Sequence, residues 1–359
     1  MLVAGVLGAF LLGCGGDVLR SVSTSDGGTI APPGAPPGSP PGTEAGAPGC
    51  PATTGLVTIA SGQAMPTSIA VNAAGIYWLS NVGLMKAPLC GGAATVLVPS
   101  TPAFLPLTGQ IAVDSMDLYF GGGCMSGAAG CGGWESAMKV SIDGGAPVAI
   151  APTGITFGVR LYAGALYWLH AGVGVETVGL SGGAPSTVVA GPALGNGLAV
   201  SAAGIFWADP GNGTLMRTPL AGGPPTVLVT GVSTPGWIIA DDGNVVWAEE
   251  SPSDSSVHLL RTVPATGGTP LTLAEGIIGN LATDGVNVYW TDHDSPASTV
   301  GSVMRVPLGG GTPTTLASGQ SQPWDLAVDG TSVYWTTGDD CPYDAGTCAS
   351  GTVMKLTPK

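Results

Sequence analysis

Hydrophobic and polar positions follow one pattern repeatedly after residue 55 of this chain. Each copy has a short apolar segment, a turn of Asp, Asn, Ala or Gly, and a second apolar segment that carries an aromatic residue at its end. The copies are Ile69–Trp78, Ile111–Phe120, Val159–Trp168, Leu198–Trp207, Ile238–Trp247, Leu281–Trp290 and Leu326–Trp335. Short apolar segments bounded by turn residues are typical of β-strands. The pattern therefore predicts a series of β-hairpins.

Two further strands are predicted in each copy. After a variable loop comes a third strand such as 215–220 (LMRTPL), then in most copies a Gly-Gly turn, and then a fourth strand such as 226–231 (TVLVTG). Successive copies begin roughly 40 residues apart, which is the spacing of four-stranded propeller blades. We therefore predict an all-β protein over residues 55–359, a seven-bladed β-propeller of four-stranded antiparallel blades.

The ends of the repeat predict how such a ring would close. The last copy ends with its third strand, at 353–359, and has no fourth strand after it. The segment 56–62 (LVTIASG) precedes the first copy and resembles an isolated fourth strand. Donation of this N-terminal strand to the last blade would close the ring and leave no open edge between blades.

Residues that recur in the repeat are interpreted as structural. The tryptophans of the second strand are expected to pack between blades, where their large area stabilises most. Aspartates at the first turn are expected to accept hydrogen bonds from their own backbone. Lys or Arg of the third strand is expected to pair with acids of the neighbouring blade, such as Asp209, Glu249 and Asp292. The tryptophans are Trp78, Trp168, Trp207, Trp247, Trp290 and Trp335, and the aspartates are Asp114, Asp241, Asp284 and Asp329.

One of these motifs has a family resemblance. Tyr289-Trp290-Thr291-Asp292 reads YWTD, and Tyr334-Trp335-Thr336-Thr337 is a variant of it. The motif resembles that of YWTD-type propellers, found in low-density-lipoprotein-receptor ectodomains, and of bacterial surface-lipoprotein propellers. The resemblance covers the repeat region and implies the fold without an activity. The best-known form of the family has six blades, so a count of seven departs from it.

The N-terminal segment predicts export. Residues 1–13 are almost wholly apolar or Gly and end in Leu11-Leu12-Gly13, directly before Cys14. This resembles the lipobox of bacterial lipoproteins, which implies cleavage before Cys14 and a diacylglycerol on its thiol. We read 1–13 as a signal peptide and 14–54 as the lipidated Cys and a Pro/Gly-rich stalk that cannot bury apolar surface. We expect the protein in the bacterial cell envelope, at the outer membrane or the cell surface.

The net charge of the chain limits the classes of partner that it is expected to bind. The formal net charge is −14, with nine Lys and Arg residues in the whole chain. Nucleic-acid binding needs clustered cations, so we expect no nucleic-acid partner. There is no polybasic segment for anionic lipid either. Membrane attachment is therefore expected through the lipid anchor only, with the folded part a monomer.

Cysteine spacing favours disulfides, as in an exported protein. Cys124 and Cys131 are seven residues apart, as are Cys341 and Cys348, and each pair falls in a long predicted loop. We expect two local disulfides, with Cys50 and Cys90 paired by elimination. A zinc site is the competing interpretation; it lacks a CxxC pair, and the three histidines are scattered along the sequence.

The predicted topology gathers the long loops on one face. In an up-and-down blade, the loop between the second and third strands emerges with the connection between blades. Trp134, Trp237 and Trp324 are outside the repeat positions and fall on this face, so we expect them to bind protein or glycan. Acids there predict a possible calcium site formed by Asp292, Asp294, Asp339 and Asp340. The alternative is that the acids maintain solubility and the tryptophans cover the core.

An enzyme is the second function considered. The chain contains none of GxSxG, HExxH or a P-loop. Bacterial streptogramin lyases are seven-bladed propellers too, and a resemblance to them would imply a site of His, carboxylate and metal. His293, between Asp292 and Asp294, is the local candidate, and His170 would fall on the same face. The repeats lack the LWFTE-like motif of that family.

Overall fold

A computed structural model of the chain describes residues 54–100, 105–106, 110–123, 136–152, 156–170, 172–191, 197–295, 298–338 and 350–359. Every regular element among them is a β-strand, and all strand pairs are antiparallel. No helix in this part of the chain could cross a membrane. The all-β prediction is confirmed, and several four-stranded antiparallel sheets are consistent with a propeller.

Four sheets have four strands each, with neighbours in chain order except where β1 joins. The first three are β2 (Ile69–Asn72), β3 (Gly75–Ser80), β4 (Gly83–Ala87) and β5 (Thr95–Pro99); β11 (Thr156–Tyr162), β12 (Ala165–His170), β13 (Gly174–Gly179) and β14 (Ser186–Ala190); and β15 (Leu198–Ser201), β16 (Gly204–Asp209), β17 (Thr214–Thr218) and β18 (Thr226–Thr230). The fourth contains β26 (Pro323–Val328), β27 (Val333–Thr337), β28 (Gly351–Thr357) and β1 (Gly55–Gln63), and β1 pairs with β28.

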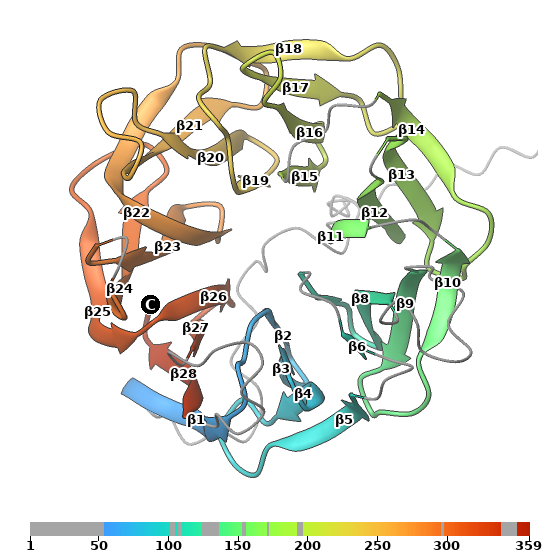
Figure 1. Cartoon of the computed structure of the whole chain (residues 1–359), viewed down its shortest axis with the longest axis vertical. Coiled ribbons are helices and arrows are strands. Elements are labelled where there is room, and N and C mark those ends of the chain that lie inside the picture. Colours follow the sequence, from blue (N-terminus) through green and yellow to red (C-terminus); the bar gives the residue numbers. More distant parts are fainter. Residues whose placement is uncertain are drawn as a thin grey trace, which may run out of the picture. The chain divides into compact units, whose positions relative to one another are not determined.

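Two sheets are larger. One contains β6 (Leu105–Pro106), β7 (Ala112–Val113), β8 (Asp117–Gly123), β9 (Ser136–Ser141) and β10 (Val148–Pro152). The other contains β19 (Ile238–Ala240), β20 (Asn244–Glu250), β21 (His258–Pro264), β22 (Leu271–Thr283), β23 (Asn287–His293), β24 (Val300–Pro307) and β25 (Thr314–Ser321). It spans two sequence copies because β22 pairs with β21 through its first half and with β23 through its second half. In Figure 1, the first strand of a copy, such as β2, β15 or β26, is the innermost strand of its sheet.

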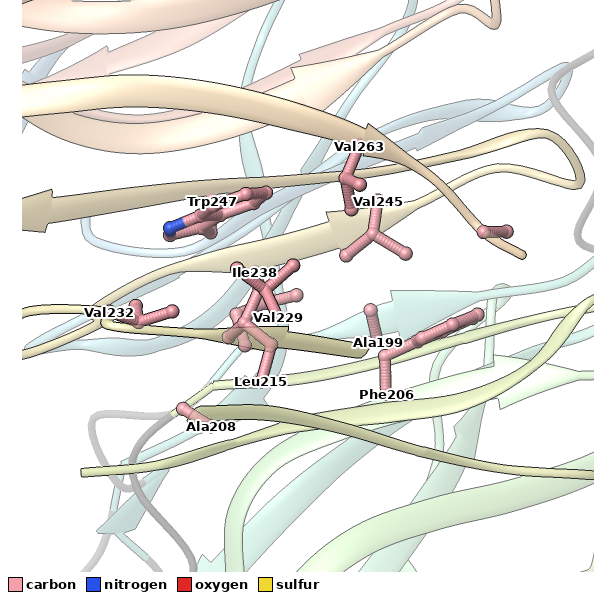
Figure 2. Close-up of a cluster of buried hydrophobic side chains, with 11 residues drawn as sticks. Ala199, Phe206, Ala208, Leu215, Val229, Val232, Ile238, Val245, Trp247 and Val263 are labelled. Atoms are coloured by element: carbon pink, nitrogen blue, oxygen red, sulfur yellow. The ribbon is translucent and has the colours of Figure 1, made fainter. Parts of the chain in front are cut away.

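Buried aromatic residues fill the spaces between neighbouring sheets. The six second-strand tryptophans are at most 4% exposed, which confirms their structural interpretation. Figure 2 shows one such space, where Trp247 and Ile238 from one sheet share a cluster with Leu215 of the next. Burial of this much apolar area is the main source of stability in a sheet protein with few charges.

The acidic first turn is also structural, as predicted. Asp284 Oδ1 accepts hydrogen bonds from the backbone N–H groups of Val286 (3.0 Å) and Asn287 (2.7 Å). Its Oδ2 accepts a hydrogen bond from the Tyr289 hydroxyl at 2.9 Å. The same carboxylate-to-backbone contacts recur at Asp114, Asp241 and Asp329. Each carboxylate therefore holds its own hairpin together.

Gly-Gly turns join the third and fourth strands for a conformational reason. Gly222 and Gly223 have φ values of 80° and 139°, a region that residues with a Cβ rarely adopt. In the equivalent Gly-Gly pairs at 91–92, 182–183, 267–268 and 310–311, φ is likewise positive at both residues. The repeated Gly-Gly pair in the sequence is thus required by the backbone.

Hydrogen bonds from the buried indoles connect adjacent sheets. Trp78 Nε1 donates to Gln63 Oε1 at 3.2 Å, and Trp335 Nε1 donates to Gln320 Oε1 at 3.1 Å. Both glutamines end an Ala-Ser-Gly-Gln segment on the outermost strand of the preceding sheet, β1 or β25. The side chain on one sheet thereby satisfies the buried N–H group of the next.

Candidate functional site

Two exposed tryptophans lie where innermost strands begin. Trp237 directly precedes β19 and is 39% exposed, and Trp324 is the second residue of β26 and is 56% exposed. Both are exposed, in contrast to the buried tryptophans of the repeat. The third tryptophan of the prediction, Trp134, lies outside the described residues.

The backbone at both tryptophans is fixed although the indoles are exposed. The Trp324 carbonyl accepts a hydrogen bond from Thr291 Oγ1 of the neighbouring repeat at 3.1 Å. The Trp237 carbonyl accepts one from the Ala248 N–H at 3.2 Å. An exposed aromatic group on an ordered backbone can contact a partner with little loss of conformational entropy.

Asp325, next to Trp324, is a buried carboxylate at the centre of the molecule. It is 5% exposed, its Oδ2 accepts the Ile69 N–H at 2.9 Å and its Oδ1 accepts the Leu326 N–H at 2.8 Å. Ile69 is the first residue of β2, so Asp325 joins β26 to the innermost strand of the neighbouring sheet. Burial raises the pKa of Asp325 to about 6, against the lowering effect of these hydrogen bonds and of the Arg160 charge.

Other polar side chains meet between the innermost strands. Gln110 Nε2 donates to Asn280 Oδ1 at 3.4 Å, although these residues belong to the second and sixth copies of the repeat. Asn280 is 6% exposed, and Gln110 Oε1 is buried without a hydrogen-bond partner. Arg160, on β11, is partly exposed, and desolvation lowers its pKa to about 10. The start of the innermost strands is therefore polar.

The predicted His–carboxylate group at 292–294 is only partly assembled. Asp292 and His293 are consecutive in β23, so their side chains leave opposite faces of the sheet. Burial raises the pKa of Asp292, whose Oδ1 is buried without a partner, and Asp294 is exposed. No ion pair joins His293 to either aspartate within the described residues. An acid–base pair at His293 has no geometric support here.

Two of the four acids of the predicted calcium site lie in the described part of the chain: Asp292 is in β23, and Asp294 follows that strand directly. Asp339 and Asp340 lie outside the described residues. Within the described ranges, no three His, Cys, Asp or Glu side chains are close enough to hold a metal ion. Calcium at Asp292, Asp294, Asp339 and Asp340 stays a prediction.

A different His–carboxylate pair is present. His170 Nδ1 lies 2.8 Å from Glu176 Oε2, and the same oxygen accepts a hydrogen bond from Trp168 Nε1 at 3.2 Å. Trp168 and Glu176 are cross-strand partners on β12 and β13. Glu176 thus accepts the hydrogen bond of the buried Trp168 indole, as the two glutamines do for Trp78 and Trp335. Periodicity pointed to the tryptophan but not to the acid opposite it.

Third-strand cations pair only partly as predicted. Arg261 contacts Glu249 at 2.6 Å, but both residues are in one blade, on β21 and β20. Asp209 and Asp292 form no ion pair with any described residue. Lys86 does reach the neighbouring sheet, where Nζ donates to the Ile142 carbonyl at 2.8 Å and lies 3.7 Å from the Asp143 carboxylate, as predicted. At Lys355 a carbonyl group replaces the expected carboxylate, because its Nζ donates to the Leu89 carbonyl at 3.1 Å.

The cysteine predictions are largely untested. Cys90 is disulfide-bonded. Its predicted partner Cys50, and the predicted pairs Cys124–Cys131 and Cys341–Cys348, lie outside the described residues, as does the lipidation site Cys14. These pairings stay predictions.

Comparison with known proteins supports the fold only. No protein-family model matches the chain, and no curated protein matches its sequence. The computationally designed Ika8 protein matches with a TM-score of 0.56 at 11% identity, over 84% of this chain and 99% of the other. A structural genomics protein of unknown function from Bacteroides thetaiotaomicron matches with a TM-score of 0.51 at 12% identity, over 86% and 76%.

A weaker match is a crystal structure of a nidogen/laminin complex. Its TM-score is 0.39 at 16% identity, over 79% of this chain and 86% of the other. Similarity at that level supports no conclusion about this chain. The fold assignment therefore rests on the sheets described above and on the two structures with TM-scores above 0.5.

Proposed function

We propose that this chain is an envelope-tethered β-propeller that binds protein or glycan with the face on which its innermost strands begin. The observation that carries the proposal is the exposure of Trp237 and Trp324 on hydrogen-bonded backbone at the same end of β19 and β26. Indole faces stack on sugar rings and are enriched in protein-binding surfaces. The protein acts as a monomer and needs no catalytic group for this role.

The proposed architecture is a closed ring of seven blades. Support comes from the seven sequence copies and from the innermost strands, which contact one another in the order β26, β2, β7, β11, β15, β19, β22 and again β26. The antiparallel pairing of β1 with β28 supports closure by the N-terminal strand. In this arrangement no blade would present an unpaired edge to its neighbour.

Ligand binding is tested with single substitutions of the exposed tryptophans. The full chain is titrated with soluble oligosaccharides from cell envelopes, and intrinsic fluorescence is recorded. We expect Trp324→Ala and Trp237→Ala each to weaken binding about tenfold or more, because a stacked aromatic group contributes roughly 1–3 kcal/mol. Val286→Ala is the matched control, since Val286 is 68% exposed but lies in a first turn, at the opposite end of its strands.

A protein partner would give a different result in the same experiment. The oligosaccharide titration would then be flat, and an envelope protein would bind the wild-type chain and Val286→Ala but neither tryptophan variant. Binding of both ligand classes that is insensitive to both tryptophan substitutions would contradict the proposal.

Tethering is tested separately in cells. We propose that Cys14 carries the lipid and that residues 15–54 form the stalk. Cys14→Ala should move the protein from the membrane fraction to the soluble fraction and abolish incorporation of a labelled fatty acid. A Cys90→Ala chain should keep both properties. Membrane association that persists in Cys14→Ala would refute the lipid anchor.

A further inference from the structure

One repeat position that is otherwise apolar carries a charged residue in a single copy. The second residue of each sequence copy lies on the innermost strand and pairs with the residue before the second-strand aromatic. At this position the copies have Ala70, Ala112, Arg160, Ala199, Ile239, Ala282 and Ala327. An arginine where the other copies have alanine or isoleucine is not required by the fold.

Arg160 has little compensation for its charge. Among the described residues, its guanidinium donates a single hydrogen bond, from Nη1 to the adjacent Val159 carbonyl at 3.1 Å. No carboxylate of the described part lies within ion-pair distance of it. Desolvation is the main cause that lowers its pKa to about 10. A desolvated cation without a partner is unfavourable, and such groups concentrate at functional sites.

Asp325 is the acid whose charge acts on Arg160, and it forms no ion pair with it. The two charges influence each other's pKa although β11 and β26 belong to different sheets. Both Asp325 oxygens already accept backbone hydrogen bonds, from Ile69 and Leu326. Asp325 therefore belongs to the joint between sheets, and among the described residues only the Val159 carbonyl accepts a hydrogen bond from Arg160.

Two amide side chains also meet between the innermost strands. Gln110 and Asn280 are hydrogen-bonded to each other from non-adjacent copies of the repeat, and Gln110 Oε1 is buried without a partner. An unpaired buried amide oxygen can accept a hydrogen bond from the protonated or hydroxyl part of a ligand. Arg160 is itself partly exposed, so solvent reaches it.

We propose that Arg160 forms an anion-binding site between the innermost strands and takes the carboxylate or phosphate group of a small ligand. The planar guanidinium offers parallel N–H donors that match two oxygens of such a group. The test of this site changes neither Trp237 nor Trp324, so its outcome can be told apart from that of the glycan or protein experiment.

The test measures thermal unfolding of the full 359-residue chain in succinate, in inorganic phosphate, and in sodium chloride at matched ionic strength. A ligand well above its dissociation constant raises the melting temperature, by several degrees at about 100 times that constant. We expect this rise in wild type and its loss in Arg160→Ala, which installs the residue found in five other copies. Arg160→Gln is a second variant that keeps a polar side chain without the charge.

The matched control is Arg217→Ala, which removes one positive charge from a third strand. Arg217 Nη2 donates to the Ala203 carbonyl at 3.2 Å, within its own sheet and away from Arg160. Anion stabilisation retained in Arg217→Ala and lost in both Arg160 variants supports the site. A rise with only one anion also supports it and identifies the group bound. No rise in wild type, or an equal rise in either Arg160 variant, overturns the proposal.

Discussion

The spaces between sheets and the region between the innermost strands use the same repeat in opposite ways. Between sheets, corresponding positions carry the same residue type, as with the tryptophans of the second strand, all at most 4% exposed. Directly before the first residue of each sequence copy, five positions carry different residues, Ser68, Gln110, Trp237, Asn280 and Asp325, and the other two copies have Gly158 and Gly197. Packing between sheets requires the same residue type in each copy, whereas the positions at the centre vary and can carry polar or aromatic side chains.

The largest effect is expected from a tryptophan of the repeat. Trp290→Ala removes a side chain that is 2% exposed and packs with Val246 and Leu260 of the preceding blade. Aromatic-to-alanine changes in cores typically cost about 3–5 kcal/mol of stability. The free energy of unfolding in urea would show this loss. A loss below about 1 kcal/mol would mean that the spaces between sheets are not the main source of stability.

Asp325 should give the next largest effect, and one that depends on pH. Asp325→Ala leaves the buried N–H groups of Ile69 and Leu326 without their partner, each worth roughly 1–3 kcal/mol. Because folding raises this pKa from 3.8 to about 6, the contribution of Asp325 is fully present below pH 3.8 and declines as pH rises through about 6. We therefore expect the variant to lose most stability near pH 4 and less at pH 8.

Ser68→Ala is the companion variant for this pH dependence. Ser68 occupies the same position in the first copy; its Oγ accepts the Ile111 N–H at 3.0 Å, and its side chain also hydrogen-bonds to the Asp325 carboxylate and lowers the pKa of that group. Its loss should cost about 1 kcal/mol and raise the pKa of Asp325 further, so the pH dependence is kept, whereas Asp325→Ala removes it. Parallel stability-against-pH curves for wild type and Asp325→Ala would contradict the raised pKa.

A smaller effect is expected from the glutamine that satisfies a buried indole. Gln320→Ala leaves Trp335 Nε1–H without its acceptor and should lower the free energy of unfolding by about 1–2 kcal/mol. Gln63→Ala should behave alike, because Trp78 depends on it in the same way. Denaturant midpoints for the two variants measure both. A difference of several kcal/mol between them would show that these two inter-sheet contacts are not equivalent.

The smallest change in stability is expected at an exposed tryptophan. Trp324→Ala should lower stability by under about 1 kcal/mol, because 56% of the side chain is already in water. Measured beside Trp290→Ala, it separates a tryptophan that holds the fold from one that is available for binding. Equal losses for the two would remove that distinction.

The sequence by itself determined the strands and their order. Apolar segments of fixed period, Gly-Gly turns and turn aspartates depend on interactions within a hairpin, so local pattern is sufficient to find them. The repeat positions of the buried tryptophans and the pairing of 55–63 with the last repeat followed from the same periodicity. The exposed tryptophans were found because they break that periodicity.

Only the tertiary structure decided which polar residues meet. Arg160 and Asp325 are far apart in sequence. Each charge nevertheless affects the pKa of the other, because the sheets converge at their innermost strands. Glu176 was missed because its role comes from the residue opposite it on another strand. Contacts between strands and between sheets cannot be deduced from the spacing of residues along one chain. The polar residues that meet at the centre could therefore be identified only from the folded structure.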